Sequence, residues 1–167
     1  SATVRSDRML MLEVEQQTVA VSNAALELEG NLQGLQFTFD SAQQVLLPAG
    51  PLDTLLKVSG ATDFNSFEFK ALQLDSAQGQ LLADGKLYLD DKQPSEFAVQ
   101  LQAFNPALFD PAYPGKLNLQ ALLSITAPLS KPLVTAQLFG LSGELLAANI
   151  DSSGTVEWTA SRQVQFN

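Results

Sequence analysis

The sequence predicts an all-β protein with antiparallel strands, and three observations lead to this prediction. Apolar residues recur with a period of two through most of the 167 residues. The connections are short and carry turn residues, as in Asp75-Ser76, Asp90-Asp91-Lys92 and Asp151-Ser152-Ser153-Gly154. Helical signals are few. Such connections favour an antiparallel meander over parallel crossovers, with about ten strands in a single domain over residues 1–167.

The first strands are short and alternate clearly. They are expected over 10–14, 19–21, 26–32 and 35–39, and Gly30 and Gly34 are the turn residues near the connection of the last two. The next segment, Pro51 to Leu56, places Leu52, Leu55 and Leu56 on one face of a helical turn, which predicts a short helix there.

The second half carries the longest alternating segments. Strands are expected over 67–69, 72–74, 81–89, 97–103, 117–127, 134–138 and 156–160. The segment 117–127 would reach roughly 35 Å, which is long for a globular strand. Before it, Asn105 is an N-cap residue followed by Pro106 at the first helical position, so a second short helix is predicted, which the prolines at 111 and 114 end.

The composition excludes several classes of function. Without cysteine or histidine there is no disulfide framework, thiol nucleophile, Ser-His-Asp triad or Cys/His metal site. A net charge of -9 and a pI near 4.2 make nucleic acid an improbable partner. The first residues lack a signal-peptide pattern, no stretch is typical of a membrane helix, and alternation continues to Phe166, so we expect a piece excised from a longer protein.

Catalytic, metal and sugar-binding functions have weak support. The acidic pairs Glu13/Glu15 and Glu27/Glu29 lie opposite the leucines of their strands, on the solvated side, and no enzyme activity is expected of them. Asp90-Asp91 and Asp151 lack the spacing of a calcium loop, so no metal and no cofactor is predicted. Trp158, Tyr88 and Tyr113 are possible sugar-stacking residues, but three scattered aromatics are more often core or rim residues.

The apolar stripes allow two interpretations. The first is the core of a closed β-sandwich or barrel that binds a protein or carbohydrate. The second is one long sheet that curls over and leaves its apolar face as an open trough for guests such as acyl chains, because no long amphipathic helix is available to cap it. A third possibility is an exposed sheet edge that templates incoming β-strands.

Three stretches from Phe67 to the end resemble the TamB family of Gram-negative bacteria. The first runs from Leu72-Gln73-Leu74 through Gly79, Leu81-Leu82 and Gly85 to Leu87-Tyr88-Leu89. The most specific is Phe104-Asn105-Pro106-Ala107-Leu108-Phe109 leading to Pro114-Gly115-Lys116-Leu117-Asn118-Leu119, and the last is Leu138-Phe139-Gly140-Leu141-Ser142-Gly143. The first sixty residues share only the general alternation of apolar and polar residues with the family.

The resemblance implies a fold and a role. The fold is a long antiparallel sheet curled into an open, U-shaped β-taco with an apolar interior. The implied role, shared with AsmA-like bridge proteins, is that of a periplasmic groove in a protein anchored in the inner membrane. Such a groove conducts phospholipid to the outer membrane or assists assembly of outer-membrane β-barrel proteins such as autotransporters. Phospholipid acyl chains or unfolded outer-membrane β-strands are the expected guests, and a TamA-like outer-membrane partner would bind through regions outside this fragment.

The residues expected to line the groove come from the clearest strands. They are Phe37, Phe39, Leu81, Leu87, Leu89, Phe97, Val99, Leu101, Leu117, Leu119, Leu123, Ile125, Leu138 and Trp158. Strand order, register and the choice of concave face stay open, because the alternation defines a face only within one strand.

Overall fold

The structure of the chain is a computed structural model. It describes residues 1–6, 10–14, 17–31, 33–47, 50–90, 93–126, 133–159 and 164–166. The side chains of residues 10–14, 17–18, 156–159 and 164–166 lie outside the description.

Twelve strands and one short 3₁₀ helix make up the described part of the chain. In order they are β1 (Ala2–Ser6), β2 (Leu10–Val14), β3 (Gln17–Asn31), β4 (Gly34–Leu47), β5 (Gly50–Thr62), β6 (Ser66–Ser76), β7 (Gly79–Tyr88), β8 (Ser95–Phe104), η1 (Pro106–Leu108), β9 (Gly115–Thr126), β10 (Leu133–Leu145), β11 (Ala148–Thr159) and β12 (Val164–Phe166).

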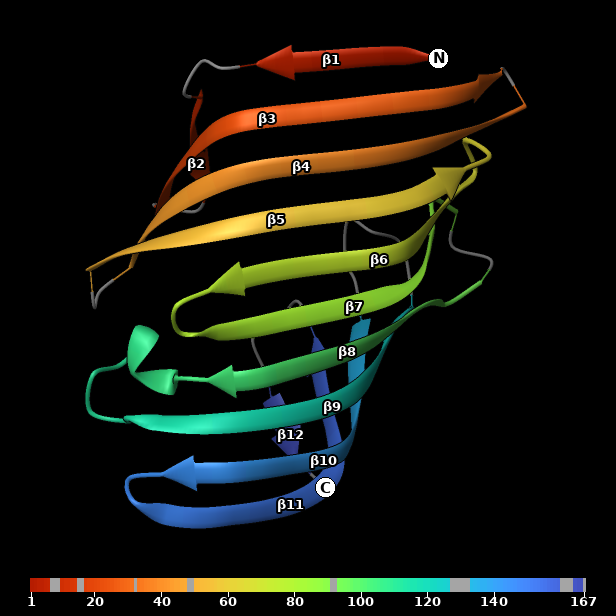
Figure 1. The fold of residues 1–167 in the computed structure, drawn as a ribbon. Coiled ribbons are helices and arrows are strands. Elements are labelled where there is room, and N and C mark those ends of the chain that lie inside the picture. Colours follow the sequence, from red (N-terminus) through yellow and green to blue (C-terminus); the bar gives the residue numbers. More distant parts are fainter. Residues whose placement is uncertain are drawn as a thin grey trace.

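All strands belong to one antiparallel sheet with a meander topology. From β3 to β12 every strand pairs with the strand that follows it in the sequence. β1 and β2 share one edge, because β1 pairs with the second half of β3 and β2 with its first half. Figure 1 shows β3 to β11 stacked in sequence order, with the termini at opposite ends of the stack.

Four of the described strands contain a bulge, which bends the strand and increases its twist. The register shifts at residues 23–24 of β3, at Lys70 of β6, at residues 102–103 of β8 and at Phe139 of β10. Asn23 and Ala103 have positive φ angles of 50° and 51°. Each bulge shifts by one residue which side chains point to a given face of the sheet. The segments expected at 67–69 and 72–74 therefore belong to one continuous strand, β6, although their apolar residues are odd-numbered in the first and even-numbered in the second.

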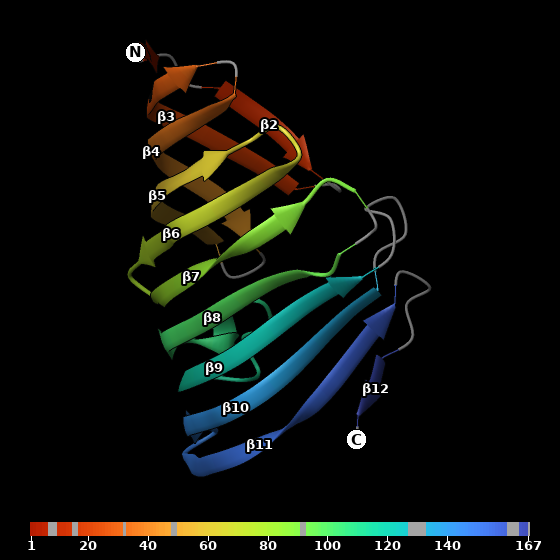
Figure 2. The ribbon, with the colours of Figure 1, turned by 90° about the vertical axis from the view of Figure 1, so that its right-hand side faces the viewer.

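The sheet curls but does not close. Figure 1 shows the far halves of the C-terminal strands turning behind the rest of the sheet, and Figure 2 shows the same strands from the side. In the described strands, no pairing joins β12 to β1 or β2. The expected fold class, an all-β open β-taco, is therefore confirmed, and the sheet is not a closed barrel.

The helix expected at Pro51 to Leu56 is wrong. These residues belong to β5, where Leu52 pairs with Val45 and Leu56 with Ser41. A helix of one or two turns gains few hydrogen bonds for the residues it fixes, whereas a strand between β4 and β6 is paired on both sides. The tertiary context therefore decides the conformation here.

The second predicted helix is confirmed as η1. The Asn105 side-chain oxygen accepts hydrogen bonds from the backbone N–H groups of Ala107 (3.1 Å) and Gly115 (3.2 Å). Its Nδ2 donates to Gln78 Oε1 at 2.9 Å, which ties η1 to the turn between β6 and β7. Asn105 thus fixes three neighbouring segments at this rim of the sheet.

The turn expected at Asp151 to Gly154 is also wrong. These residues lie inside β11, and the chain reverses at Leu146 and Ala147 instead. Both have positive φ angles, 53° and 61°, as a tight hairpin turn requires. The sequence gives no sign of this turn, because glycine and asparagine, the usual residues at such positions, are absent from it.

Candidate functional site

The cross-strand register sorts the side chains onto two faces, because directly paired residues point to the same side of a sheet. One row of paired positions runs through Phe37, Gly60, Phe69, Gly85 and Phe97, on β4 to β8. We call the face that carries this row the inner face and the opposite one the outer face.

Two further rows on the inner face run parallel to the first, across the strands. One contains Leu26, Phe39, Val58, Leu72, Ala83, Val99, Ala121 and Leu138. The other contains Leu56, Leu74, Leu81, Leu101, Leu119 and Leu141. The rows form an apolar surface that continues from strand to strand along the stack.

The charged residues lie on the outer face. At paired positions with described side chains, every Asp, Glu, Lys and Arg falls there. These residues are Arg5, Glu27, Glu29, Asp40, Asp53, Lys57, Glu68, Asp75, Asp84, Lys86, Glu96, Lys116, Glu144 and Asp151. Among the described paired positions, this acidic protein therefore keeps its inner face free of charge.

No second layer covers the inner face of the described sheet. Along β4 the inner Phe37 and Phe39 are half-buried while the outer Gln36 and Thr38 are exposed. Val21 and Ala121 are the described hydrophobic residues that are buried, and no large described side chain is fully buried. The accessible area is 11092 Å², against about 8000 Å² for a compact protein of this mass. The closed-sandwich interpretation is therefore wrong for the described residues.

The phenylalanines of the inner face converge over glycines. The ring centroids of Phe37 and Phe69 are 5.9 Å apart, as are those of Phe69 and Phe97, although each pair is separated by an intervening strand. A Cβ atom on Gly60 would lie 2.7 Å from the Phe37 ring, and one on Gly85 would lie 2.8 Å from the Phe97 ring. The two glycines therefore leave the space that the rings occupy.

Most of the predicted groove residues come together on the inner face. Phe37, Phe39, Leu81, Leu87, Phe97, Val99, Leu101, Leu117, Leu119, Leu123, Ile125 and Leu138 all occupy inner positions. Leu89 lies beyond the end of β7 and is 47% exposed. Trp158 pairs with Val134 in the ladder, but its side chain lies outside the described part.

Several inner-face residues were not predicted. Leu56 belongs to the segment expected to form a helix, and Val58 follows that segment, although Leu56, Val58 and Gly60 keep a period of two. Phe69 and Leu72 lie on opposite sides of the Lys70 bulge. The apolar residues change there from odd to even numbers, and this change is the sequence signal of the bulge. The alternation of apolar residues also gives no indication of the polar inner-face residues Ser41, Gln43 and Thr54.

The alternative sites do not assemble in the described residues. Glu27 and Glu29 lie on the outer face, as expected, while Glu15 and the Glu13 side chain lie outside the description. Within the described part, no three acidic side chains come close enough to hold a metal ion. Tyr88 has the Lys86 Nζ 5.0 Å from its ring centroid, and Tyr113 is a separate exposed loop residue.

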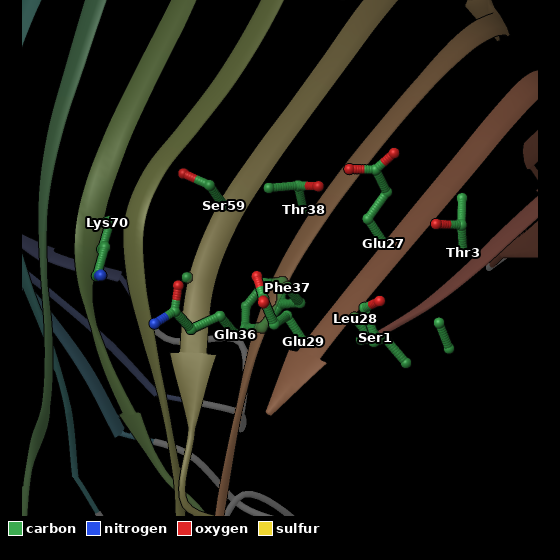
Figure 3. A pocket seen from close by; sticks show the side chains of 12 residues that line it. Ser1, Thr3, Glu27, Leu28, Glu29, Gln36, Phe37, Thr38, Ser59 and Lys70 are labelled. Carbon is green, nitrogen blue, oxygen red and sulfur yellow. The ribbon is translucent and has the colours of Figure 1, made fainter. Parts of the chain in front are cut away.

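A polar hollow of about 390 Å³ marks the outer face. Figure 3 shows Lys70, Ser59, Thr38, Glu27 and Thr3 side by side on successive strands of this face. Most of its lining residues are polar or charged, including Glu27, Glu29 and Lys70, in contrast to the apolar rows of the inner face.

The comparisons give the chain its family. No curated protein matches it, and no solved structure matches it. None of the described helices is long and apolar enough to cross a membrane. A sequence model described as "TamB, N-terminal domain" matches residues 1–167, which extends the likeness seen from Phe67 onward over the first sixty residues. The chain therefore belongs to the TamB family.

Proposed function

We propose that the inner face is one section of a periplasmic groove that conducts phospholipid between the inner and outer membranes. The observation that carries the proposal is the inner face itself, an apolar surface without charge at its described positions and without a covering layer. Membership of the TamB family associates the chain with outer-membrane biogenesis, which gives such a surface a use.

Burial of the acyl chains would drive binding. Transfer of a CH₂ group out of water contributes about 0.8 kcal/mol, so a chain laid along the rows binds without any specific polar contact. Because the rows continue across the strands, a bound chain can shift from one strand to the next at little cost. We expect little selectivity among acyl chains.

The wider setting is also part of the proposal. The section would belong to a periplasmic protein that is anchored in the inner membrane and meets a TamA-like outer-membrane partner through regions outside this chain. Transport rather than catalysis is its activity, and no cofactor takes part.

The test is a pair of arginine substitutions on one strand. Leu119→Arg places a charge on the inner face, while the neighbouring Gln120→Arg places it on the exposed outer face. We expect Leu119→Arg to remove co-purified phospholipid, measured by native mass spectrometry, and Gln120→Arg to retain it, because an unpaired charge is costly beside apolar chains. Circular dichroism checks that both variants are folded.

A photoreactive group at position 119 gives an independent measurement. It should crosslink to phospholipid, and the same group at position 120 should not. If the wild-type chain carries no lipid and neither position crosslinks to it, the conduit proposal is wrong for this section.

A second candidate function rests on the open edge of the sheet. Among the described strands, β1 pairs with β3 alone, and Val4 on this edge is 60% exposed. Such an edge offers backbone groups to an incoming strand, as assembly of outer-membrane β-barrel proteins requires. Crosslinks from position 4 to an unfolded barrel protein, unaffected by Leu119→Arg, would favour strand templating over lipid conduction.

A further inference from the structure

A small polar cluster interrupts the apolar inner face near one end of the strands. Ser41, Gln43 and Thr54 lie together there, because Ser41 and Gln43 alternate along β4 and Thr54 pairs directly with Gln43. Apolar pairs flank the cluster on both sides, with Val45 and Leu52 toward the turn between β4 and β5, and Leu56 and Leu74 toward the middle of the sheet.

The hydrogen bonding of this cluster is incomplete. Ser41 is 5% and Thr54 is 4% exposed. Gln43 Nε2 donates to Ser41 Oγ at 3.2 Å, whereas Thr54 Oγ1 has no hydrogen-bond partner. Thr62, another buried inner-face threonine, donates its hydroxyl to the Ser66 carbonyl at 2.7 Å. A buried hydroxyl without a partner destabilises a fold, so its position calls for an explanation.

The chemistry of the cluster selects a neutral acceptor. Two hydroxyls and one amide supply donors, and the nearby charged residues, Asp53, Lys57 and Asp75, lie on the outer face of β5 and β6. A phosphate group would lose its hydration here without gaining a cation. An uncharged carbonyl oxygen needs only a donor, and Thr54 Oγ1 has a proton that no other group accepts.

The position of the cluster fits the ester linkage of a diacyl lipid. Ser41 pairs with Leu56, which begins the row that continues through Leu74, Leu81 and Leu101. An acyl chain lying on this row would bring its ester carbonyl to the start of the row. Gln43 faces Thr54 across the ladder and holds Ser41 by a single bond, so a rotation of its side chain would open Thr54 to the guest.

We infer that Ser41, Gln43 and Thr54 form a subsite that binds the ester carbonyl groups of a diacyl lipid. The inference rests on the proposed function and adds to it a fixed point on an otherwise unselective surface. Bound lipid would pause here with its ester groups at β4 and β5 and its acyl chains along the row that begins at Leu56.

The test compares two lipids that differ only in the carbonyl groups. The probes are vesicles of dioleoyl phosphatidylcholine and vesicles of its diether analogue with the same chains, which lacks the ester carbonyls. We expect the 167-residue chain to retain the ester lipid about 5-fold better, as one hydrogen bond to a buried donor provides. Native mass spectrometry after gel filtration measures the lipid retained.

Two variants assign the preference to the hydroxyl. Thr54→Val keeps the shape of the side chain and should abolish the preference for the ester lipid, while Thr54→Ser keeps the hydroxyl and should preserve it. Gln43→Leu, at a half-buried position, is expected to weaken the preference and gives a second reading should a position-54 variant fold poorly.

The outcomes separate this inference from the proposed function. Equal retention of ester and ether lipids by the wild-type chain overturns the subsite and leaves the conduit intact. Retention of neither lipid overturns both. A preference for the ester lipid that survives in Thr54→Val also overturns the role of Thr54 Oγ1.

Discussion

The inner and outer faces are made of alternate residues of the same strands, yet they differ in the interactions that their side chains make. The inner face depends on shape, since the rings of Phe37, Phe69 and Phe97 fill the space above two glycines. The outer face carries the charges, and its side chains are mostly exposed. Packing between side chains is therefore concentrated on the inner face, although that face has no covering layer.

The largest effect is expected from filling the space at an inner glycine. A Cβ atom at position 60 would lie 2.1 Å from the Glu68 carbonyl oxygen, so Gly60→Ala forces two strands apart. We expect a loss of about 3 kcal/mol in the free energy of unfolding, measured by urea denaturation. The control is Gly140→Ala, at an outer position where nothing lies within 4 Å. Equal losses in both variants would contradict the difference between the faces.

The next effect comes from removing the central ring. Phe69 contacts Phe37, Phe67 and Phe97, so Phe69→Ala should cost about 2 kcal/mol, below the roughly 3–5 kcal/mol of a fully buried phenylalanine because this ring is half-buried. The matched variant Phe139→Ala removes a bulge residue that is 58% exposed and should change stability by less than about 0.5 kcal/mol. A loss of 4 kcal/mol or more at Phe69, on the order of the largest core truncations, would indicate a covered core.

A smaller, pH-dependent effect is expected at the turn between β5 and β6. Asp63 Oδ1 accepts hydrogen bonds from Ser66 Oγ (3.0 Å), Ser66 N (2.7 Å) and Asn65 N (3.0 Å), and the bond from the Ser66 side chain leads in lowering the pKa of Asp63. A lowered folded-state pKa stabilises the fold above the unfolded-state pKa, and this contribution is lost as the pH falls through the folded-state pKa.

Asp63→Ala should therefore be less stable than the wild type at neutral pH, and the difference should shrink toward about pH 2. Urea midpoints at both pH values measure it. A difference that does not change with pH would show that the charge of Asp63 has no part in this turn.

The smallest effect is expected from an ion pair on the outer face. Arg5 Nη2 and Glu27 Oε1 lie 3.7 Å apart, and the two side chains are 73% and 57% exposed. A double-mutant cycle with Arg5→Ala and Glu27→Ala should give a coupling of at most about 0.5 kcal/mol, because water and salt screen such a pair. A coupling above about 1 kcal/mol would mean that outer-face charges also hold the sheet together.

The sequence predicted the alternation within strands, and therefore much of the inner face. Leu117, Leu119, Leu123 and Ile125 share one face of β9 because no bulge interrupts them. The N-cap at Asn105 was also recognisable, since its side-chain chemistry is local. Such features depend on neighbours in the chain, and single-sequence reasoning can identify them.

The errors arose where long-range pairing decides. The sequence predicts a helix for the first part of β5, Pro51 to Leu56, because the pairing of this segment with β4 and β6 is not visible in the segment itself. It does not predict the hairpin turn at Leu146 and Ala147, because neither residue is a typical turn former. The bulge at Lys70 reverses parity between Phe69 and Leu72. A role for Thr54 is not predictable from the sequence, because only the register between β4 and β5 shows that it lies opposite Gln43.

The meander topology makes the architecture extensible. Since each strand from β3 onward pairs with its successor, adding one hairpin would lengthen the stack by about 10 Å and leave the cross-section unchanged. Because each of these strands pairs with its neighbours in the sequence, an added hairpin can pack onto the preceding strand as soon as it is synthesised. The length of the sheet can therefore change in evolution by the gain or loss of whole hairpins.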